Sequence, residues 1–146
     1  MNQPFYEFTS SIEALRYEFT SIGQRVVRKV IIYQELPFPN VYNLALGDTD
    51  DQGKADFGIT SDNGDRDTIL ATVIQTLITF FHKYPQASVF IAGSTPSRTR
   101  LYQGVINREL GEIQKRFDVL GVTEDGTESF SKGKSYQAFV ISLKQL

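Results

Sequence analysis

The chain has 146 residues, of which 40% are hydrophobic and 22% charged, and its formal net charge is −2. This length and composition are typical of one globular domain, so we treat residues 1–146 as a single domain. The absence of cysteine excludes disulfides, thiolate catalysis and cysteine-based metal sites. The slight negative charge argues against a protein that coats nucleic acid through bulk charge.

The N-terminal residues, MNQPFYEFTSS, have no basic start followed by an apolar run, which a signal peptide would need. No apolar segment approaches the roughly 20 residues of a membrane-spanning helix. We therefore expect a cytoplasmic protein without a membrane partner.

The first third of the chain predicts strands. Tyr17 and Phe19 alternate with polar residues before a Gly-Gln turn, and residues 25–34 are rich in Val, Ile and Tyr. After a proline-containing break, residues 41–46 form a further strand and residues 55–60 a weaker fourth. Short turns between these segments favour an antiparallel meander.

After these strands, the spacing of the hydrophobic residues changes from every two residues to the 3.6-residue period of a helix. Apolar residues from Ile69 to Phe81 predict a first helix, and cap-type residues precede it. Residues 88–92, SVFIA, indicate a short central strand that is buried on both faces. A second helix is expected over residues 96–117, with a buried stripe that begins at Leu101 and Tyr102.

The last part of the chain predicts a strand at residues 119–123, a polar loop at 124–134 and a final strand at 136–143. The predicted fold class is α+β, with a meander followed by helix, strand, helix and one or two strands, and with the helices packed on a mixed sheet. This order resembles the ribonuclease H-like fold, by topological analogy alone.

The segment GSTPSRTR, residues 93–100, joins the central strand to the second helix. Thr95 suits the N-cap position, and Pro96 suits the first helical position. Acidic side chains are preferred at a helix start, yet this one carries Arg98 and Arg100. A bound anion would make those cations favourable, because first-turn amides, hydroxyls and a guanidinium together hold phosphate or carboxylate. The candidate anion-binding residues are Ser94, Thr95, Ser97, Arg98, Thr99 and Arg100.

Helical phase separates the two arginines. Arg98 lies at the margin of the apolar stripe, where it can lean over the sheet edge beside Ser94, whereas Arg100 points toward solvent or a partner. Arg98 is therefore the preferred functional residue. Supporting positions are Asp62, Asn63, Asp65 and Tyr102. In the structural alternative, Arg98 pairs with an acid of the 62–67 turn and Tyr102 belongs to the core.

Metal and catalytic patterns are weak. The acidic turn at residues 48–53 resembles a calcium loop, but its twelfth position is Ile59 where a bidentate Glu is required. Asp62, Asp65 and Asp67 could hold magnesium, although helix capping explains them more simply. The single histidine, His82, builds no triad. We expect no metal and no cofactor, and the sequence assigns no catalytic residue.

Basic residues interleave with aromatics on the second predicted strand, which carries Arg25, Arg28, Lys29 and Tyr33. Such a pattern can contact single-stranded nucleic acid. Protection of an edge strand by charge is the commoner explanation, and we favour it.

Several segments together resemble a family of small bacterial proteins, a domain of unknown function common in Bacteroidetes. The pattern contains Asn-Gly-Asp at residues 63–65, Leu-Ala-Thr at 70–72, Lys-Tyr-Pro at 83–85, and Gly-Ser-Thr-Pro followed by Arg-Thr-Arg-Leu-Tyr within 93–102. The resemblance covers most of the chain up to about Phe117. It implies a bacterial source and no established activity.

Three function classes follow. The first is a non-enzymatic module that binds a phosphate-bearing ligand, a nucleotide, a nucleic acid or an acidic partner protein through GSTPSRTR, in a toxin–antitoxin or phage-defence setting. The second is a metal-dependent enzyme acting on phosphodiesters. The third is a structural protein whose arginines pair with a neighbouring subunit in a homo-oligomer. The first is favoured.

Overall fold

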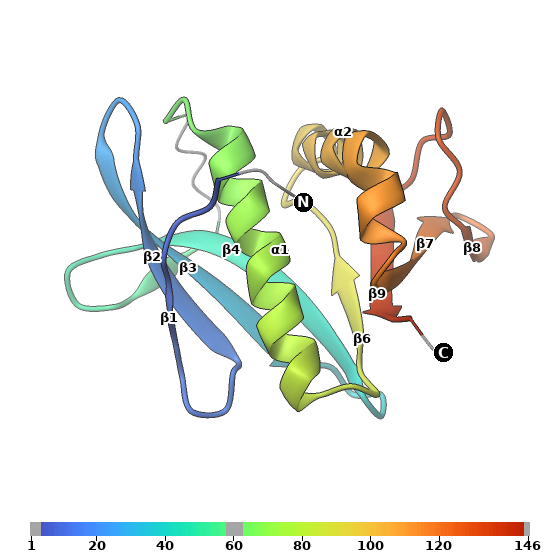
Figure 1. Ribbon diagram of the computed structural model, residues 1–146, viewed down its shortest axis with the longest axis horizontal. Helices are drawn as coiled ribbons and strands as arrows, with labels where there is room; N and C mark the ends of the chain where they lie inside the picture. The colour runs from blue at the N-terminus through green and yellow to red at the C-terminus, as the bar shows by residue number, and fades with distance from the viewer. Residues whose placement is uncertain (1–3, 58–62, 145–146) are drawn as a thin grey trace.

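A computed structural model of the chain describes residues 4–57 and 63–144. Its fold is α+β, with two helices packed on one face of a mixed, mostly antiparallel sheet, as the sequence predicts (Figure 1). The sheet has the strand order β1-β2-β3-β4-β6-β9-β7-β8, and β5 pairs with β4 beside this path. None of the helices in the described ranges is long and apolar enough to cross a membrane.

The meander consists of β2 (Arg16–Ile22), β3 (Val26–Glu35) and β4 (Val41–Thr49), which pair antiparallel in sequence order. This confirms the predicted strands, although β4 continues three residues beyond the expected end at Leu46. A two-residue strand, β1 (Thr9–Ser10), pairs with β2 at the sheet edge. Of the expected strand at 55–60, β5 (Ala55–Asp56) pairs with β4, and residues 58–60 lie outside the described residues.

Helix α1 (Arg66–Lys83) connects the meander to β6 (Ser88–Ile91), which runs parallel to β4. The position of β6 between β4 and β9 confirms the predicted central strand. Its predicted burial on both faces is wrong, because Val89 and Ile91 are buried whereas Ser88 and Phe90 are only partly covered. The reason is that both helices lie on the same face and leave the other face of the sheet uncovered.

Helix α2 (Pro96–Ile113) ends four residues before the predicted end. Phe117, assigned to the helix by its period, instead begins β7 (Phe117–Thr123), where it is buried against the helix layer. The predicted loop at 124–134 contains β8 (Gly126–Ser129), which forms a hairpin with β7. The sequence hides β8 because its residues are polar and carry no hydrophobic alternation.

The final strand, β9 (Ala138–Leu143), lies antiparallel between β6 and β7. The chain therefore places three antiparallel strands after α2, where the sequence predicts one or two. The analogy describes the order of elements only as far as α2. β6, β9, β7 and β8 form a second, antiparallel half of the sheet, and β6 joins this half to the meander.

The core lies between the helices and the sheet and is rich in aromatic rings. Tyr33 of β3 stacks on Phe80 of α1 with ring centroids 4.3 Å apart, and its hydroxyl is 2.8 Å from that of Thr76. Burial raises the pKa of Tyr33 well above its ordinary value. This packing holds α1 against the meander.

Candidate functional site

The turn between β6 and α2 is built by local hydrogen bonds. Thr95 has an extended backbone, and its hydroxyl accepts from the backbone N–H of Arg98 at 3.2 Å, so it is the N-cap that the sequence predicts. The Thr99 hydroxyl is buried, accepts from the N–H of Gly93 at 3.0 Å and donates to the Thr95 carbonyl. Thr99 therefore holds the turn together.

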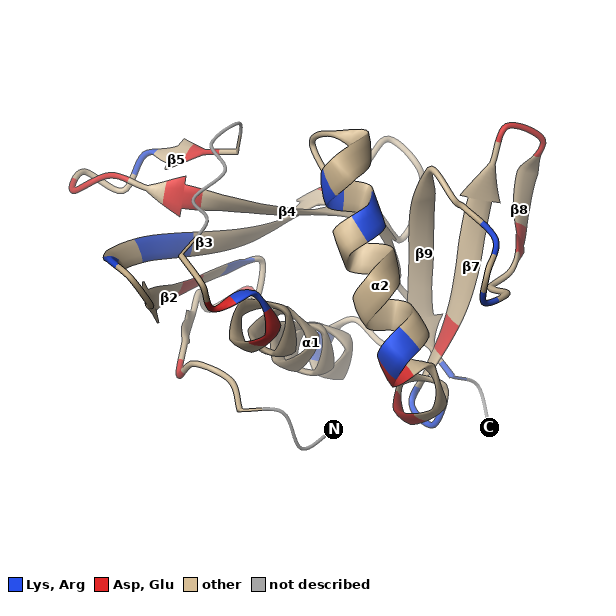
Figure 2. Cartoon of the chain, turned by 90° about the horizontal axis from the view of Figure 1, so that it is seen from above, with Lys and Arg blue, Asp and Glu red and all other residues tan. Residues whose placement is uncertain are grey.

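The two arginines lie where helical phase predicts. Arg98 donates from Nη1 to the Ser94 hydroxyl at 2.8 Å and to the carbonyl of Phe57 at 3.3 Å. Arg100 is exposed, and its guanidinium donates to the Ser97 hydroxyl at 3.1 Å. Over the described part of the chain, no carboxylate forms an ion pair with Arg100. Figure 2 shows the basic residues at the start of α2, beside β4.

Arg98 lines a cavity of about 230 Å³. This cavity lies between the first turns of both helices, near the N-terminal end of β3 and the C-terminal end of β4. The lining includes Lys29, Leu46, Asp48, Asp65, Arg98, Leu101 and Tyr102. Burial raises the pKa of the Tyr102 phenol, and the nearby positive charge of Arg98 opposes that shift. The cavity lining thus combines Arg98 with aromatic and aliphatic side chains, a composition typical of small-molecule sites.

The floor of the cavity contains an ion pair that sequence reasoning missed. Lys29 and Asp48 are directly opposite in the β3–β4 register, with Nζ 2.6 Å from Oδ1 and side chains only 7% and 15% exposed. The predicted role of Lys29 in protecting an edge strand is wrong, because β3 lies between β2 and β4. Lys29 lies two and four residues before the buried Ile31 and Tyr33, so all three side chains are on the same face of β3. This spacing is the signal in the sequence that Lys29 faces inward.

Asn63 joins the turn before α1 to the β2–β3 turn. Its Oδ1 accepts from the backbone N–H of Arg25 at 2.7 Å, and its Nδ2 donates to the Arg25 carbonyl at 2.8 Å and to the Ser21 hydroxyl at 3.0 Å. The side chain is almost completely buried. Asn63 therefore acts as a structural clamp at the edge of the cavity.

Asp65 occupies the N-cap position of α1, but its carboxylate does not cap the helix, contrary to the sequence prediction. Its Oδ2 instead accepts from the Tyr6 hydroxyl at 2.5 Å and from the Ser21 hydroxyl. The burial of Tyr6 raises its pKa, and the hydrogen bond to Asp65 adds to the rise. Asp62, the other supporting acid, lies outside the described residues.

The remaining acidic candidates do not converge on the cavity. Asp67 pairs with Arg108 of α2 at 3.3 Å, with both side chains half exposed. Between residues 4–57 and 63–144, no group of three His, Asp or Glu side chains could hold a metal ion. His82 is exposed near the C-terminal end of α1, away from these residues.

Comparison with protein families matches residues 2–144 to a family of unknown function, DUF6934. Comparison with curated proteins and with solved structures finds no match. The family therefore covers nearly the whole chain but assigns no ligand.

Proposed function

The chain belongs to DUF6934, a family of unknown function, and from its geometry we propose that it is a non-enzymatic module that binds a small phosphate-bearing ligand in the Arg98 cavity. The observation that carries the proposal is the position of Arg98. Arg98 lines the cavity from the first turn of the capped helix α2, and its guanidinium donates to the Ser94 hydroxyl at 2.8 Å. Ser94 and the residues of the helix start that precede Arg98 do not line the cavity, so the charge of Arg98 is the group that favours a phosphate there.

Charge and size support a small ligand. The cavity lining carries the cations of Lys29, Arg66 and Arg98 against the carboxylates of Asp48 and Asp65. Two of these charges, Lys29 and Asp48, form an ion pair with each other. The volume of about 230 Å³ suits a compact ligand.

Isothermal titration calorimetry with inorganic phosphate and with a nucleoside 5′-monophosphate tests the proposal. Arg98→Ala is expected to weaken binding about 10- to 100-fold, because a charge-assisted hydrogen bond contributes roughly 1.5–3 kcal/mol. Arg100→Ala is the matched control, since Arg100 belongs to the same helix start but does not line the cavity. The affinity of Arg100→Ala for both phosphate ligands should stay within twofold of the affinity of the unchanged protein.

Equal losses in the two variants, or binding that survives Arg98→Ala, would refute the proposed site. Thermal unfolding of both variants should accompany the titrations, because a loss of affinity counts only if the fold is retained. No contact among the described residues favours a metal-dependent enzyme or a subunit interface, and we propose neither.

A further inference from the structure

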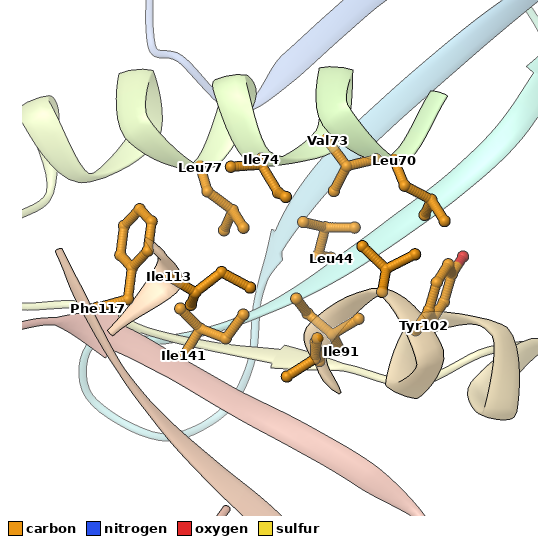
Figure 3. A pocket seen from close by; sticks show the side chains of 12 residues that line it. Leu44, Leu70, Val73, Ile74, Leu77, Ile91, Tyr102, Ile113, Phe117 and Ile141 are labelled. Carbon is orange, nitrogen blue, oxygen red and sulfur yellow. The ribbon is translucent and has the colours of Figure 1, made fainter. Parts of the chain in front are cut away.

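A second, apolar cavity of about 50 Å³ lies between α1 and α2 above the sheet. Figure 3 shows side chains from three directions pointing into this space, among them Val73 and Leu77 from α1, Ile113 from α2, and Leu44 and Ile91 from the sheet. Among the described residues that line it, Tyr102 is the one with a polar side-chain group. We name this space the helix crevice.

The helix crevice meets the Arg98 cavity. Leu70 of α1 and Tyr102 of α2 line both spaces, so the two cavities lie on either side of the same pair of side chains. Arg98 contributes to the lining of the polar cavity, and its charge acts on the Tyr102 phenol. An anionic group beside Arg98 would therefore lie next to an apolar space that begins at Tyr102.

We infer that the ligand is a phosphate monoester with a short aliphatic tail, and that the tail occupies the helix crevice. This inference rests on the proposed function and adds the chemical class of the ligand. A space for one water-sized group needs about 10–15 Å³, so the crevice accommodates roughly four such groups, which limits the tail to a short aliphatic chain.

The chemistry of the lining selects an aliphatic group over the alternatives. A buried water requires two to four polar partners, and the crevice offers a single hydroxyl. A nucleobase would bring several donors and acceptors, which would be left without partners among the leucine, isoleucine and valine side chains. An aliphatic tail loses no hydrogen bonds on entering and gains the free energy of apolar burial.

The test compares methyl phosphate with isopentyl phosphate by calorimetry on the whole chain. Burial of each added methylene favours binding by about fourfold, so we expect isopentyl phosphate to bind at least tenfold more tightly. Ile74→Phe adds volume to the crevice and should reduce this preference to within twofold without changing the affinity for methyl phosphate. Ile74→Val, the matched control, should retain the preference. Arg98→Ala should weaken both ligands.

The outcomes separate the two proposals. If methyl and isopentyl phosphate bind equally to the unchanged protein, or if Ile74→Phe retains the preference, the inference about the tail is overturned and the phosphate site stands. If neither ligand binds, the proposed function itself fails. Should Ile74→Phe not fold, nuclear Overhauser contacts between the isopentyl methyl groups and Ile106 or Leu77 decide the question, and their absence overturns the inference.

Discussion

At the scale of single residues, Gly93 determines how closely the start of α2 approaches the end of β6. A Cβ atom at this position would lie 2.5 Å from the Arg98 Cβ and 2.5 Å from the backbone nitrogen of Thr99. Both neighbours belong to the capped first turn, so neither can move without disturbing the cap. The glycine is therefore required by this close approach, which also places Arg98 at the cavity wall.

Gly93→Ala is expected to lower the free energy of unfolding by about 2 kcal/mol or more, because the first turn of α2 must shift to admit a methyl group. Gly104→Ala is the matched control. Gly104 lies inside the same helix with no atom within 4 Å of the added Cβ, so helix propensity should raise stability by about 0.5–1 kcal/mol. Urea unfolding of both variants measures the difference, and a neutral Gly93→Ala would contradict the close approach.

Patterns in neighbouring residues of the sequence predict the roles of some residues of the site but not of others. Thr95, Pro96 and the orientation of Arg98 follow from capping and helical phase, which involve residues only a few positions apart. The roles of Asn63 and Asp65 do not follow, because their partners Arg25 and Ser21 are 38 and 44 positions away. A sequence shows that such residues are polar but not which distant backbone groups they meet.

At the scale of elements, the helix period and the strand alternation predict both helices and most strands. They fail where a short segment has polar residues on both faces, as in β8, or where an apolar residue fits two periods, as Phe117 does. Beyond its backbone pairing with β7, β8 is held by polar side-chain contacts of Glu128. Glu128 accepts from Lys134 Nζ at 2.6 Å and from the Tyr136 hydroxyl at 3.0 Å.

These contacts predict that the stability of the β7–β8 hairpin depends on pH in the acidic range. The hydrogen bond from Lys134, followed by that from Tyr136, holds the pKa of Glu128 below its ordinary value of 4.5. Because the folded-state pKa is depressed, the stabilisation is present above pH 4.5 and is lost as the pH falls through the folded value. We expect the stability difference between the unchanged protein and Glu128→Gln to vanish in that acidic window. Thermal unfolding at a series of pH values measures it, and a difference that is constant with pH would contradict this assignment.

At the scale of the whole molecule, β6 joins the two halves of the sheet. It pairs with β4 of the meander on one side and with β9 of the C-terminal half on the other. Both helices cover the same face, and side chains from both helices and both halves line the helix crevice. We therefore expect one cooperative unit whose halves share a single hydrophobic core.

Val89, at the centre of β6, tests this expectation because its side chain is fully buried. Val89→Ala should lower the free energy of unfolding by about 2–3 kcal/mol through loss of apolar burial and creation of a cavity. If the halves unfold together, amide hydrogen exchange of the most protected residues in β3 and in β7 should accelerate by the same factor, roughly 30- to 150-fold. Val140→Ala is the matched control, because Val140 is only half-buried, on the face of β9 away from the helices. This substitution should lower the free energy of unfolding by less than about 1 kcal/mol. Faster exchange in only one half would mean that the meander and the C-terminal strands are separately stable, and that β6 merely connects them.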